Sequence, residues 1–515
     1  MNIGEWSRKR ARLWPERLFL KQGDCACANR DFDRRVNRMA RVLLARGVQK
    51  GDRVAVVMVN CSGFLEVFFA CAKLGAILVP INHHLAPPEL ARTIADCTPR
   101  VLVHSPAFAS VVAELRPGLD HTAVLTHAGE ALAAASGHDD PADPAGAAEP
   151  AISWHVGLDD PLLILFTSGT TGSLKGAVLS HENFLFGAIQ NMLFGVNAGF
   201  KSLVAAPLFH IGALVASVTP VIYAGGSLVI RDFDNPSEII RLIMQEQINY
   251  MFAVPAMFNM MSKAPAWADA DFSHVHFFVS GGAPMPVPLI RQYQDEKGVH
   301  FVQGYGMTET LRICSLDPAD ARRKVGSIGK EMFHTTVRIV DEAGAEVPDE
   351  ETGEIIVKGP TVFSRYWNDP EATAAAIRDG WFHTGDLGRR DAEGFITIVG
   401  RKSDMIICSG RNIYAAEVER AIESIGQVSE VAVVGLPDPV RGEVPAAFLA
   451  WKGAEAPTAE ELAAMLKGRL APYKIPRKVV FMHALPKTGS GKVAKNELKR
   501  RFESNAAGTA DEVER

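Results

Sequence analysis

The sequence predicts an α/β protein, and three observations support this fold class. Amphipathic helical patterns alternate with short apolar runs over residues 32–104, which is typical of parallel sheets covered by helices. Two apolar runs, residues 162–166 and 275–280, lead directly into the glycine-rich loops TSGTTGSLKG and GGAP. After residue 326, short strands separated by DEAG and DAEG turns indicate a smaller antiparallel element, and a compact α+β pattern follows from residue 412.

Length and composition limit the class of protein. A chain of 515 residues is too long for one compact core, so two or three domains are expected. Its 47% hydrophobic and 22% charged residues are typical of a soluble globular enzyme. The net charge of −5 gives no general attraction to nucleic acid or to an anionic membrane, so no nucleic-acid partner is predicted.

The cysteines indicate a reducing environment. Seven of them are scattered along the chain, and only Cys25 and Cys27 lie close together, with no second pair downstream. This pattern matches neither a zinc site nor a disulfide framework, and it predicts a cytoplasmic location.

The N-terminal twenty residues contain basic side chains but no long apolar core, so they do not match a secretory signal. No run in the chain approaches the ~20 apolar residues that a membrane span requires. Two interpretations of the basic run stay open: a weak peripheral contact with a lipid surface, or the solvated face of a first helix. The run consists of Arg8, Lys9, Arg10 and Arg12.

The first 120 residues carry the clearest alternation of helix and strand. Residues 32–46 are predicted to be a helix because Val36, Met39, Val42 and Leu43 form one apolar stripe, and Gly47 stops it. The following elements are predicted as strand 53–59, helix 63–74, strand 77–81, helix 89–96 and strand 101–104.

Residues 128–151 are rich in Ala, Asp, Pro and Gly, and they predict a surface excursion rather than a domain boundary. The α/β pattern then resumes, and apolar segments 218–223 and 227–230 flank Gly225-Gly226. The predicted elements are strand 162–166, helix 181–188, strand 203–206, helix 239–246, strand 250–254 and strand 300–302.

The last third of the chain changes in character. Residues 401–405, RKSDM, form a polar stretch between two strands and predict a hinge between a large and a small domain. Residues 486–492, PKTGSGK, predict a second mobile loop, and a polar tail follows from residue 504. The predicted elements are strands 337–340, 353–357, 395–399 and 406–408, helix 416–425, strands 428–435 and 446–451, helix 459–469 and strand 478–481.

Thr167–Gly176 has the composition of a loop that holds phosphates. Seven Ser, Thr and Gly residues follow the apolar strand, and Lys175 comes shortly after them. Small residues let backbone amides approach a ligand, hydroxyls donate hydrogen bonds, and the lysine adds positive charge. A flexible surface loop is the alternative, and the preceding strand argues against it. The loop is not a Walker A motif, because Lys175 is followed by Gly176 rather than by Ser or Thr.

Glu309 and Thr308 stand in the loop QGYGMTET, directly after strand 300–302. Glu309 suits Mg²⁺, which proteins bind through one or two carboxylates beside phosphate oxygens. Thr308 offers a hydroxyl to the same phosphates. The alternative is a turn in which Thr308 only caps a following helix.

Two further motifs carry charged candidates. Asp386 lies between glycines in WFHTGDLG, where a fixed carboxylate can accept hydrogen bonds from both ribose hydroxyls, and Arg401 would add a second ribose contact. The alternative is a simple turn-forming aspartate. Lys492, in a Gly-Ser-Gly-Lys loop, is a long cation that can stabilise a developing phosphate charge, and a solvated lysine is the alternative.

Five segments together resemble the adenylate-forming superfamily, which contains acyl-CoA synthetases, peptide-synthetase adenylation domains and firefly luciferase. The segments are TSGTTGSLKG, QGYGMTET, WFHTGDLG, GRKSDMIICSGRNIYAAEVE and PKTGSGK, and they follow the family's order and spacing over nearly the whole chain. PLFHIGAL, VSGGAP and YWNDPEAT look most like bacterial fatty-acyl-CoA and feruloyl-CoA synthetases. The resemblance implies a large N-terminal domain, residues 1–402, of two doubly wound α/β subdomains plus a β-barrel-like part. It also implies a small mobile α+β C-terminal domain, residues 403–515.

The same resemblance implies an ATP-dependent carboxylate–CoA ligase that uses ATP, Mg²⁺ and coenzyme A. Lys492 would bridge the carboxylate and the α-phosphate, with Thr308 and Glu309 beside the phosphates and Glu309 on Mg²⁺. The small domain would turn about Ser403 and bring Gly410 to the CoA channel. The residues implied to hold the nucleotide are Thr167, Ser168, Gly169, Thr170, Thr171, Gly172 and Lys175 for phosphates, Gly281, Gly282 and Ala283 for adenine, Asp386 and Arg401 for ribose, and Gly304, Tyr305, Gly306, Met307 and Ile398 in addition.

Two positions depart from the family pattern. Ser403 stands where relatives usually have Asp or Lys as the hinge, which bears on domain rotation. Arg411 follows Gly410 and adds a positive charge near the opening of the family's CoA channel.

The acyl pocket implied by the family would use Phe209, His210, Gly212, Val279 and Met307, together with residues 304–306. These segments contain no arginine, and the sequence does not place Arg312, the nearest candidate to bind a second carboxylate. A medium- or long-chain fatty acid is therefore predicted over a dicarboxylate. An aryl acid of the cinnamate or ferulate type, an adenylation enzyme that loads a carrier protein, and a homodimer are left open.

Overall fold

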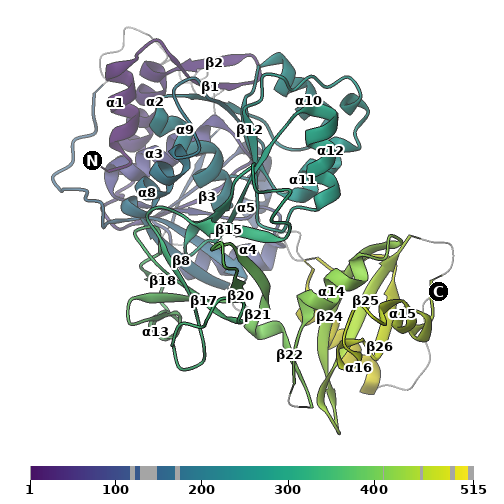
Figure 1. The fold of residues 1–515 in the computed structure, drawn as a ribbon. Coiled ribbons are helices and arrows are strands. Elements are labelled where there is room, and N and C mark those ends of the chain that lie inside the picture. The colour runs from purple at the N-terminus through teal and green to yellow at the C-terminus, as the bar shows by residue number, and fades with distance from the viewer. Residues whose placement is uncertain are drawn as a thin grey trace. The chain divides into compact units, whose positions relative to one another are not determined.

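The structure is a computed structural model that describes residues 2–115, 122–127, 148–168, 174–409, 411–452, 456–487 and 493–507. The chain forms two compact units, the first made of Met1–Val337 and Val357–His383 and the second of Arg338–Ile356 and Thr384–Arg515 (Figure 1). The domain boundary predicted between residues 402 and 403 falls within the second unit, and it stays a prediction.

One sheet of the first unit is parallel in its middle and antiparallel at one edge. Its strand order is β18-β8-β7-β4-β3-β5-β6, in which β7, β4, β3, β5 and β6 run parallel. Its central strands are buried on both faces, as expected where helices cover a parallel sheet. The bounds are β3 (Arg53–Val57), β4 (Ile77–Pro80), β5 (Val101–His104), β6 (Ala123–Thr126), β7 (Pro161–Ser168), β8 (Leu174–Ser180) and β18 (Arg365–Tyr366).

The other sheet of the first unit has the order β2-β1-β10-β9-β11-β12-β13-β14-β15. The strands from β1 to β13 pair in parallel, and β14 returns antiparallel to β13. The two sheets confirm the predicted α/β class. The bounds are β1 (Leu18–Gln22), β2 (Cys25–Ala28), β9 (Lys201–Val204), β10 (Ser227–Ile230), β11 (Tyr250–Ala253), β12 (Phe277–Gly281), β13 (Phe301–Met307), β14 (Leu311–Leu316) and β15 (Ser327–Glu331).

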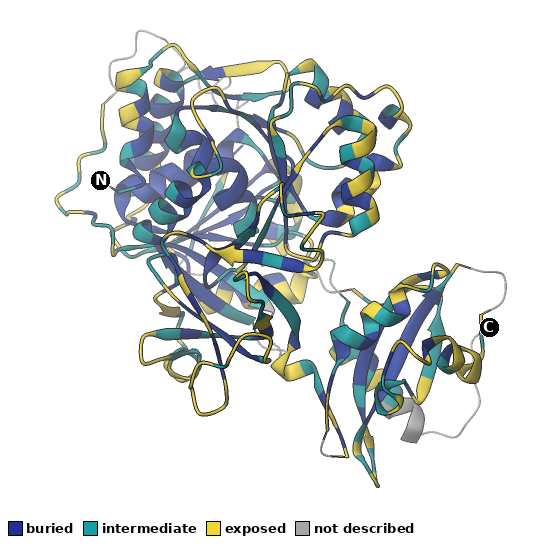
Figure 2. Ribbon diagram, viewed as in Figure 1, coloured by how far each residue is buried: buried dark blue, intermediate teal, exposed yellow. Residues whose placement is uncertain are grey.

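The helices of the first unit begin and end at recognisable caps. Ser180 and Asn183 form a reciprocal capping box at the start of α8, and Gly75 ends α3 with a left-handed φ of 66°. In Figure 2 the outward faces of α10 and α12 are exposed and their inner faces are buried. The bounds are α1 (Glu5–Leu13), α2 (Asn29–Ala45), α3 (Ser62–Leu74), α4 (Pro87–Cys97), α5 (Ala109–Leu115), α8 (His181–Met192), α9 (Thr219–Ala224), α10 (Pro236–Gln245), α11 (Pro255–Ser262), α12 (Val287–Lys297) and α13 (Pro370–Ala376).

The basic run of the N-terminal helix divides into two parts. Arg8, Lys9 and Arg12 are exposed, as expected for a solvated face, whereas the Arg10 side chain is buried and donates to the carbonyls of Ile222 and Gly226 at 2.7 Å each. His181 also holds this end of the chain, because its Nδ1 accepts a hydrogen bond from the Ile3 amide at 3.2 Å. These contacts tie the N-terminus to segments about 180 and more residues away in sequence.

The second unit contains four strands in the order β16-β17-β20-β21, followed by an α+β segment. In that segment the order is β23-β22-β25-β24, and β26 pairs in parallel with β25. The bounds are β16 (Thr336–Val340), β17 (Gly353–Lys358), β20 (Trp381–Arg390), β21 (Ile396–Arg401), β22 (Met405–Cys408), β23 (Arg411–Tyr414), β24 (Val428–Asp438), β25 (Gly442–Trp451) and β26 (Lys478–Met482), with helices α14 (Ala415–Glu423), α15 (Ala459–Leu466) and α16 (Lys495–Ala507). The short strand β19 (Ile377–Arg378) belongs to the first unit.

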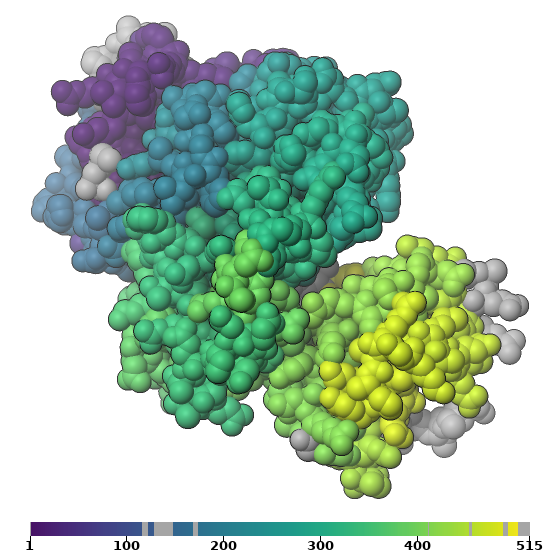
Figure 3. All heavy atoms as spheres, in the orientation of Figure 1, coloured from purple at the N-terminus to yellow at the C-terminus, as the bar shows by residue number. Residues whose placement is uncertain are grey.

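Both faces of the β24–β25 hairpin are buried, because alternate side chains point to opposite sides. Val433 and Val444 pack with residues of α14 and α15, while Val434 and Phe448 pack with Leu498 of α16. The segment from β22 onward, yellow-green to yellow, forms a compact body of atoms (Figure 3).

None of the seven cysteines, all of which lie in the described residues, forms a disulfide, and Cys25 is the one that is exposed. Burial raises the pKa of Cys61 to about 11 and that of Cys97 to about 12, and it raises the pKa of Cys71 further. Among the helices in the described ranges, none combines the length and the apolar character that a membrane crossing needs.

Candidate active site

The hairpin β7–β8 brings Thr167 and Lys175 side by side. These residues face each other in the antiparallel register, and the Thr167 hydroxyl donates to the Lys175 carbonyl at 3.3 Å. The apolar residues 162–165 of β7 are buried and fix the hairpin in the sheet. Ser168 ends β7, and Gly169, Thr170, Thr171 and Gly172 lie outside the described residues.

Glu309 is buried and holds a specific partner that the sequence did not indicate. The hydroxyl of Tyr366 donates a hydrogen bond to Oε1 of Glu309 at 3.0 Å. Burial, and then the neighbouring Glu309 carboxylate, raise the pKa of Tyr366 well above its usual range, so the phenol stays a donor. The backbone on both sides is tied as well, because the Phe363 amide donates to the Glu309 carbonyl at 2.7 Å.

Tyr366 contacts both Lys175 of the β7–β8 hairpin and the Glu309 carboxylate. Tyr366 lies on β18, which pairs with β8, and the Nζ of Lys175 is 5.3 Å from the centre of the Tyr366 ring. A cation, a phenol and a buried carboxylate therefore come together from three separate segments. Thr308 lies in the turn between β13 and β14, so the alternative in which it caps a helix is wrong, because a strand follows.

The predicted adenine and acyl residues form a wall of closely packed glycines. Gly281 and Gly304 face each other on β12 and β13, and a Cβ on Gly281 would lie 3.0 Å from the Gly304 carbonyl oxygen. The ring of Phe252 packs against these glycines. A Cβ atom added to Gly212 would lie 2.7 Å from this ring, and a Cβ atom added to Gly281 would lie 3.3 Å from it. Tyr305, Gly306 and Met307 continue β13, Val279 is buried on β12, and Gly282 and Ala283 are exposed beyond its end.

Phe209 and His210 stand in a cluster of rings. The centre of the Phe209 ring is 5.0 Å from that of His83 and 4.5 Å from that of His210. Asn60 anchors this segment, since its Oδ1 accepts from the Leu208 amide at 2.9 Å and its Nδ2 donates to the Ala206 carbonyl at 3.0 Å. Burial lowers the pKa of His83 to about 4, so its ring is neutral near pH 7.

The structure places Arg312, the arginine nearest to the predicted pocket segments, which the sequence alone did not locate. Its side chain is buried, and a Cβ built on Gly304 would lie 2.7 Å from the Arg312 Nε. The cation therefore lies directly against one of the predicted pocket glycines.

Asp386 and Arg401 form an ion pair in the second unit. They face each other on β20 and β21, and Arg401 Nε is 3.0 Å from Asp386 Oδ1. Asp386 is buried while Arg401 is largely exposed, so the arginine fixes the carboxylate from its solvent side. Ile398 lies on β21 opposite Gly388, and Ser403 stands in a short 3₁₀ turn, where its hydroxyl donates to Asp404 at 3.1 Å. Gly410 and Lys492 lie outside the described residues.

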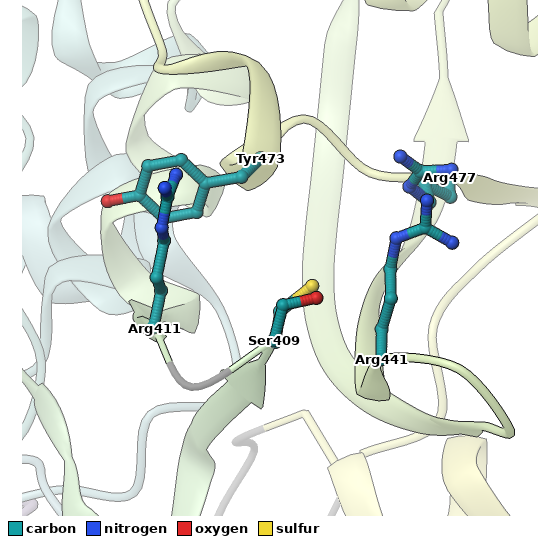
Figure 4. Close-up of a pocket in the computed structure, with 6 residues that line it drawn as sticks. Ser409, Arg411, Arg441, Tyr473 and Arg477 are labelled. Atoms are coloured by element: carbon teal, nitrogen blue, oxygen red, sulfur yellow. The ribbon is translucent and has the colours of Figure 1, made fainter.

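A basic pocket of about 200 Å³ lies in the α+β segment of the second unit (Figure 4). Arg411 lies over the Tyr473 ring, with its Cζ 5.0 Å from the ring centre, and Arg441 and Arg477 lie close together at the other side. Asp438 is the acid nearby: hydrogen bonds from the Val440 and Arg441 amides lower its pKa, and the charges of Arg441 and Arg477 add to this. The lining residues are Cys408, Ser409, Arg411, Arg441, Tyr473 and Arg477.

Comparison with known proteins gives the following relatives. A family model described as AMP-binding enzyme matches residues 7–367, and one described as AMP-binding enzyme C-terminal domain matches residues 417–492. The chain is 41% identical to a feruloyl-CoA synthase of Amycolatopsis sp over 502 residues, which cover 97% of this chain and 99% of the relative. It is 36% identical to a long-chain-fatty-acid–CoA ligase of Mycobacterium tuberculosis over 508 residues, which cover 97% and 98%.

A solved structure resembles the chain over almost its full length. It is the O-succinylbenzoate coenzyme A synthetase of Bacillus subtilis in complex with ATP and magnesium ion, with a TM-score of 0.83 and 32% identity. The similarity covers 96% of this chain and 99% of that one.

Proposed function

The chain belongs to the AMP-binding enzyme family, and on that basis we propose that it is an ATP-dependent acid–thiol ligase that joins a carboxylic acid to coenzyme A through an acyl-adenylate. The observation that carries this proposal is the grouping of Lys175, Tyr366 and Glu309 in the first unit. It supplies a cation and an oriented carboxylate at the end of a hairpin whose loop has phosphate-binding composition.

In the first half-reaction, an oxygen of the acid attacks the α-phosphate of ATP, and pyrophosphate leaves. Thr167 and Lys175 would hold the β- and γ-phosphates, and Asp386, oriented by Arg401, would accept hydrogen bonds from the ribose hydroxyls. Lys492 would neutralise charge as the new P–O bond forms.

Glu309 fits a Mg²⁺ ion that accompanies the triphosphate. Mg²⁺ sites of this kind use one or two protein carboxylates, and Glu309 is buried with one oxygen oriented by Tyr366. The ion, when bound, supplies charge neutralisation to the phosphates. The contribution of the chain is to hold the carboxylate in one orientation.

In the second half-reaction, the thiol of coenzyme A attacks the carbonyl carbon of the acyl-adenylate, and AMP leaves. We assign the phosphates of coenzyme A to the pocket of Arg411, Arg441 and Arg477, because clustered guanidinium groups bind phosphate oxygens well. For this step the C-terminal domain would turn about Ser403, which would move Lys492 away and bring Gly410 to the CoA channel.

Two classes of acid are candidates. The apolar pocket segments favour a medium- or long-chain fatty acid, since each buried methylene contributes about 0.8 kcal/mol. An aryl acid is supported by the cluster of His83, Phe209 and His210, where an aromatic substrate ring finds ring partners, and by the relationship to a feruloyl-CoA synthase.

The proposal is tested by measuring CoA-dependent AMP release with octanoate, ferulate and acetate, each acid in a separate assay. Use of octanoate or ferulate at a clearly higher kcat/KM than acetate supports the respective class. Pyrophosphate release without CoA-dependent AMP release would instead favour an adenylation enzyme that loads a carrier protein. No adenylation of any acid would refute the ligase.

A further inference from the structure

Arg312 is a buried cation beside the glycines of the predicted acyl pocket. It lies on β14 and is 9% exposed, and its Cζ is 5.4 Å from the centre of the Phe194 ring. Its Nε is the atom nearest to the position that a Cβ on Gly304 would occupy. Gly304 in turn lies opposite Gly281 on the neighbouring strand. The guanidinium is therefore packed between an aromatic ring and the glycines of the predicted acyl pocket.

The Arg312 guanidinium lacks a polar partner among the described residues. Its Nη1 is buried without a hydrogen-bond partner, and no carboxylate of the described ranges contributes to its electrostatic environment. Tyr250 is the nearest titratable neighbour, and its hydroxyl donates elsewhere, to the Ala216 carbonyl. Burial accordingly lowers the pKa of Arg312. Buried charges are normally paired, because an unpaired one loses its hydration without compensation.

The surroundings of Arg312 have further features of a ligand site. The segment Ala213–Val218 directly after Gly212 is π-helical, a rare form that is frequent at functional sites. Its carbonyls at Val215 and Ala216 are bound by the side chains of Asn191 and Tyr250. Gln190 of α8, four residues before Phe194, is also buried, and neither of its amide atoms has a partner.

We propose that Arg312 is a specificity-determining residue that binds an oxygen acceptor at the end of the acid remote from the reacting carboxylate. The substrate class is thus an acid that carries a second carboxylate, or a phenol or methoxy oxygen, rather than an acid with an apolar end. The proposal rests on the proposed ligase function and names the substrate class of that same site. Donation by a charged group to a buried acceptor changes affinity by about tenfold to a hundredfold.

The test compares matched pairs of acids on the unaltered enzyme. Ferulate and 4-carboxycinnamate are each compared with cinnamate, and octanedioate is compared with octanoate, by kcat/KM for CoA-dependent AMP release. We expect at least one acid with a remote oxygen to exceed its apolar partner by tenfold or more. A preference for 4-carboxycinnamate or octanedioate identifies the second carboxylate as the recognised group, and a preference for ferulate identifies the phenol or methoxy oxygen.

Variants of Arg312 then assign the preference to this side chain. Arg312→Met should lower kcat/KM for the preferred acid by about tenfold to a hundredfold and leave its apolar partner unchanged or improved, while Arg312→Lys should retain part of the preference. Thermal stabilisation by each acid gives a readout independent of turnover. Arg322→Met, at an exposed arginine, is the matched control.

Three results would overturn the inference and each is distinct from failure of the ligase itself. The apolar acids could be preferred by the unaltered enzyme, Arg312→Met could reduce all acids equally, or it could leave the preference intact. If Arg312→Met does not fold, the matched pairs on the unaltered enzyme and the Arg312→Lys variant still decide. Absence of activity with every acid would refute the proposed function instead.

Discussion

The hydroxyl of Tyr366 determines which way the Glu309 carboxylate points. It donates at 3.0 Å to one carboxylate oxygen, and the same ring lies beneath the ammonium group of Lys175. A phenol with a raised pKa stays neutral throughout the usual assay range, so this hydrogen bond persists at alkaline pH. One side chain therefore holds the metal-binding candidate and the phosphate-binding candidate in register.

Replacing Tyr366 by Phe should lower the rate of adenylation by about tenfold to a hundredfold, because a hydrogen bond to a charged group contributes roughly 1.5–3 kcal/mol. The concentration of Mg²⁺ needed for half-maximal rate should rise at the same time. ATP–pyrophosphate exchange at varied Mg²⁺ concentration measures both.

The control for this variant is Tyr293→Phe, which removes a hydroxyl that donates to the Phe258 carbonyl at 2.8 Å. That variant should reduce thermal stability without changing the Mg²⁺ requirement. Equal Mg²⁺ dependence in the two variants would show that Tyr366 is only a packing residue.

Individual site residues were predictable from the sequence only where they stand in a motif. Thr167, Lys175 and Glu309 lie in Gly/Thr-rich segments that follow strands, and such segments are visible in one dimension. Tyr366 contacts Glu309, which is 57 residues away, and Phe252 contacts Gly281, which is about 30 residues away. No local sequence pattern marks a partner at such a distance. The stretch YWNDPEAT contained Tyr366, yet it offered only a family likeness. The sequence shows Arg312, but only the structure shows that its side chain lies against Gly304.

The N-terminal helix α1 depends on a histidine at the start of α8. His181 is buried, and burial lowers its pKa to about 4, with Asp160 and Lys50 as the charged groups nearby. The neutral ring accepts the Ile3 amide at Nδ1. Since the pKa of histidine in an unfolded chain is about 6.5, the contribution of His181 to stability is present above that pH and is lost as the pH falls towards 4.

Between pH 7 and pH 5 this group alone should cost about 2 kcal/mol of unfolding free energy. Urea denaturation at a series of pH values measures the effect. A His181→Gln variant should be less stable at pH 7 and should show a shallower loss on acidification. An unchanged slope in the variant would mean that other groups, such as His83, account for the acid sensitivity.

The turn between β24 and β25 supplies the basic pocket with Arg441, and the segment before β26 supplies Arg477. Replacing both by Gln should raise the KM for CoA by at least tenfold, because two charge-assisted hydrogen bonds to phosphate would be lost. Adenylation without CoA should be unchanged. Separate assays of the two half-reactions measure this.

Arg501→Gln provides the comparison, since Arg501 is exposed on α16 and pairs with Glu497. A similar rise in KM there would indicate a general charge effect and not a pocket.

The order of elements was largely predictable, because apolar periodicity is local information. The parallel strands β3, β4 and β5 and the helices between them lie where residues 53–104 predicted them. The segment 218–223 was left unassigned, since a short apolar run fits a buried helix as well as a strand. In the structure most of it belongs to α9. The π-helical turn before it leaves no sequence signature, because it depends on side chains of Asn191 and Tyr250 that reach its carbonyls.

At the level of the complete enzyme, the proposal requires Lys492 to act in only one of the two half-reactions. Lys492→Ala should lower adenylation by about 10²–10³-fold, the usual effect of removing one transition-state charge. Thioester formation from a pre-made acyl-adenylate should be nearly unaffected. Single-turnover assays of each half-reaction give the two rates, and an equal loss in both would contradict alternation between two arrangements.

The burial of the cysteines has a chemical consequence for an enzyme of this kind. An acyl-adenylate is a mixed anhydride that acylates accessible thiolates, so an exposed and ionised cysteine of the protein would compete with coenzyme A. Cys61, Cys71 and Cys97 are kept as thiols by raised pKa values, and Cys314 and Cys408 are buried. We therefore expect little self-acylation at these buried thiols, and the exposed cysteine, Cys25, is on β2 at the edge of a sheet.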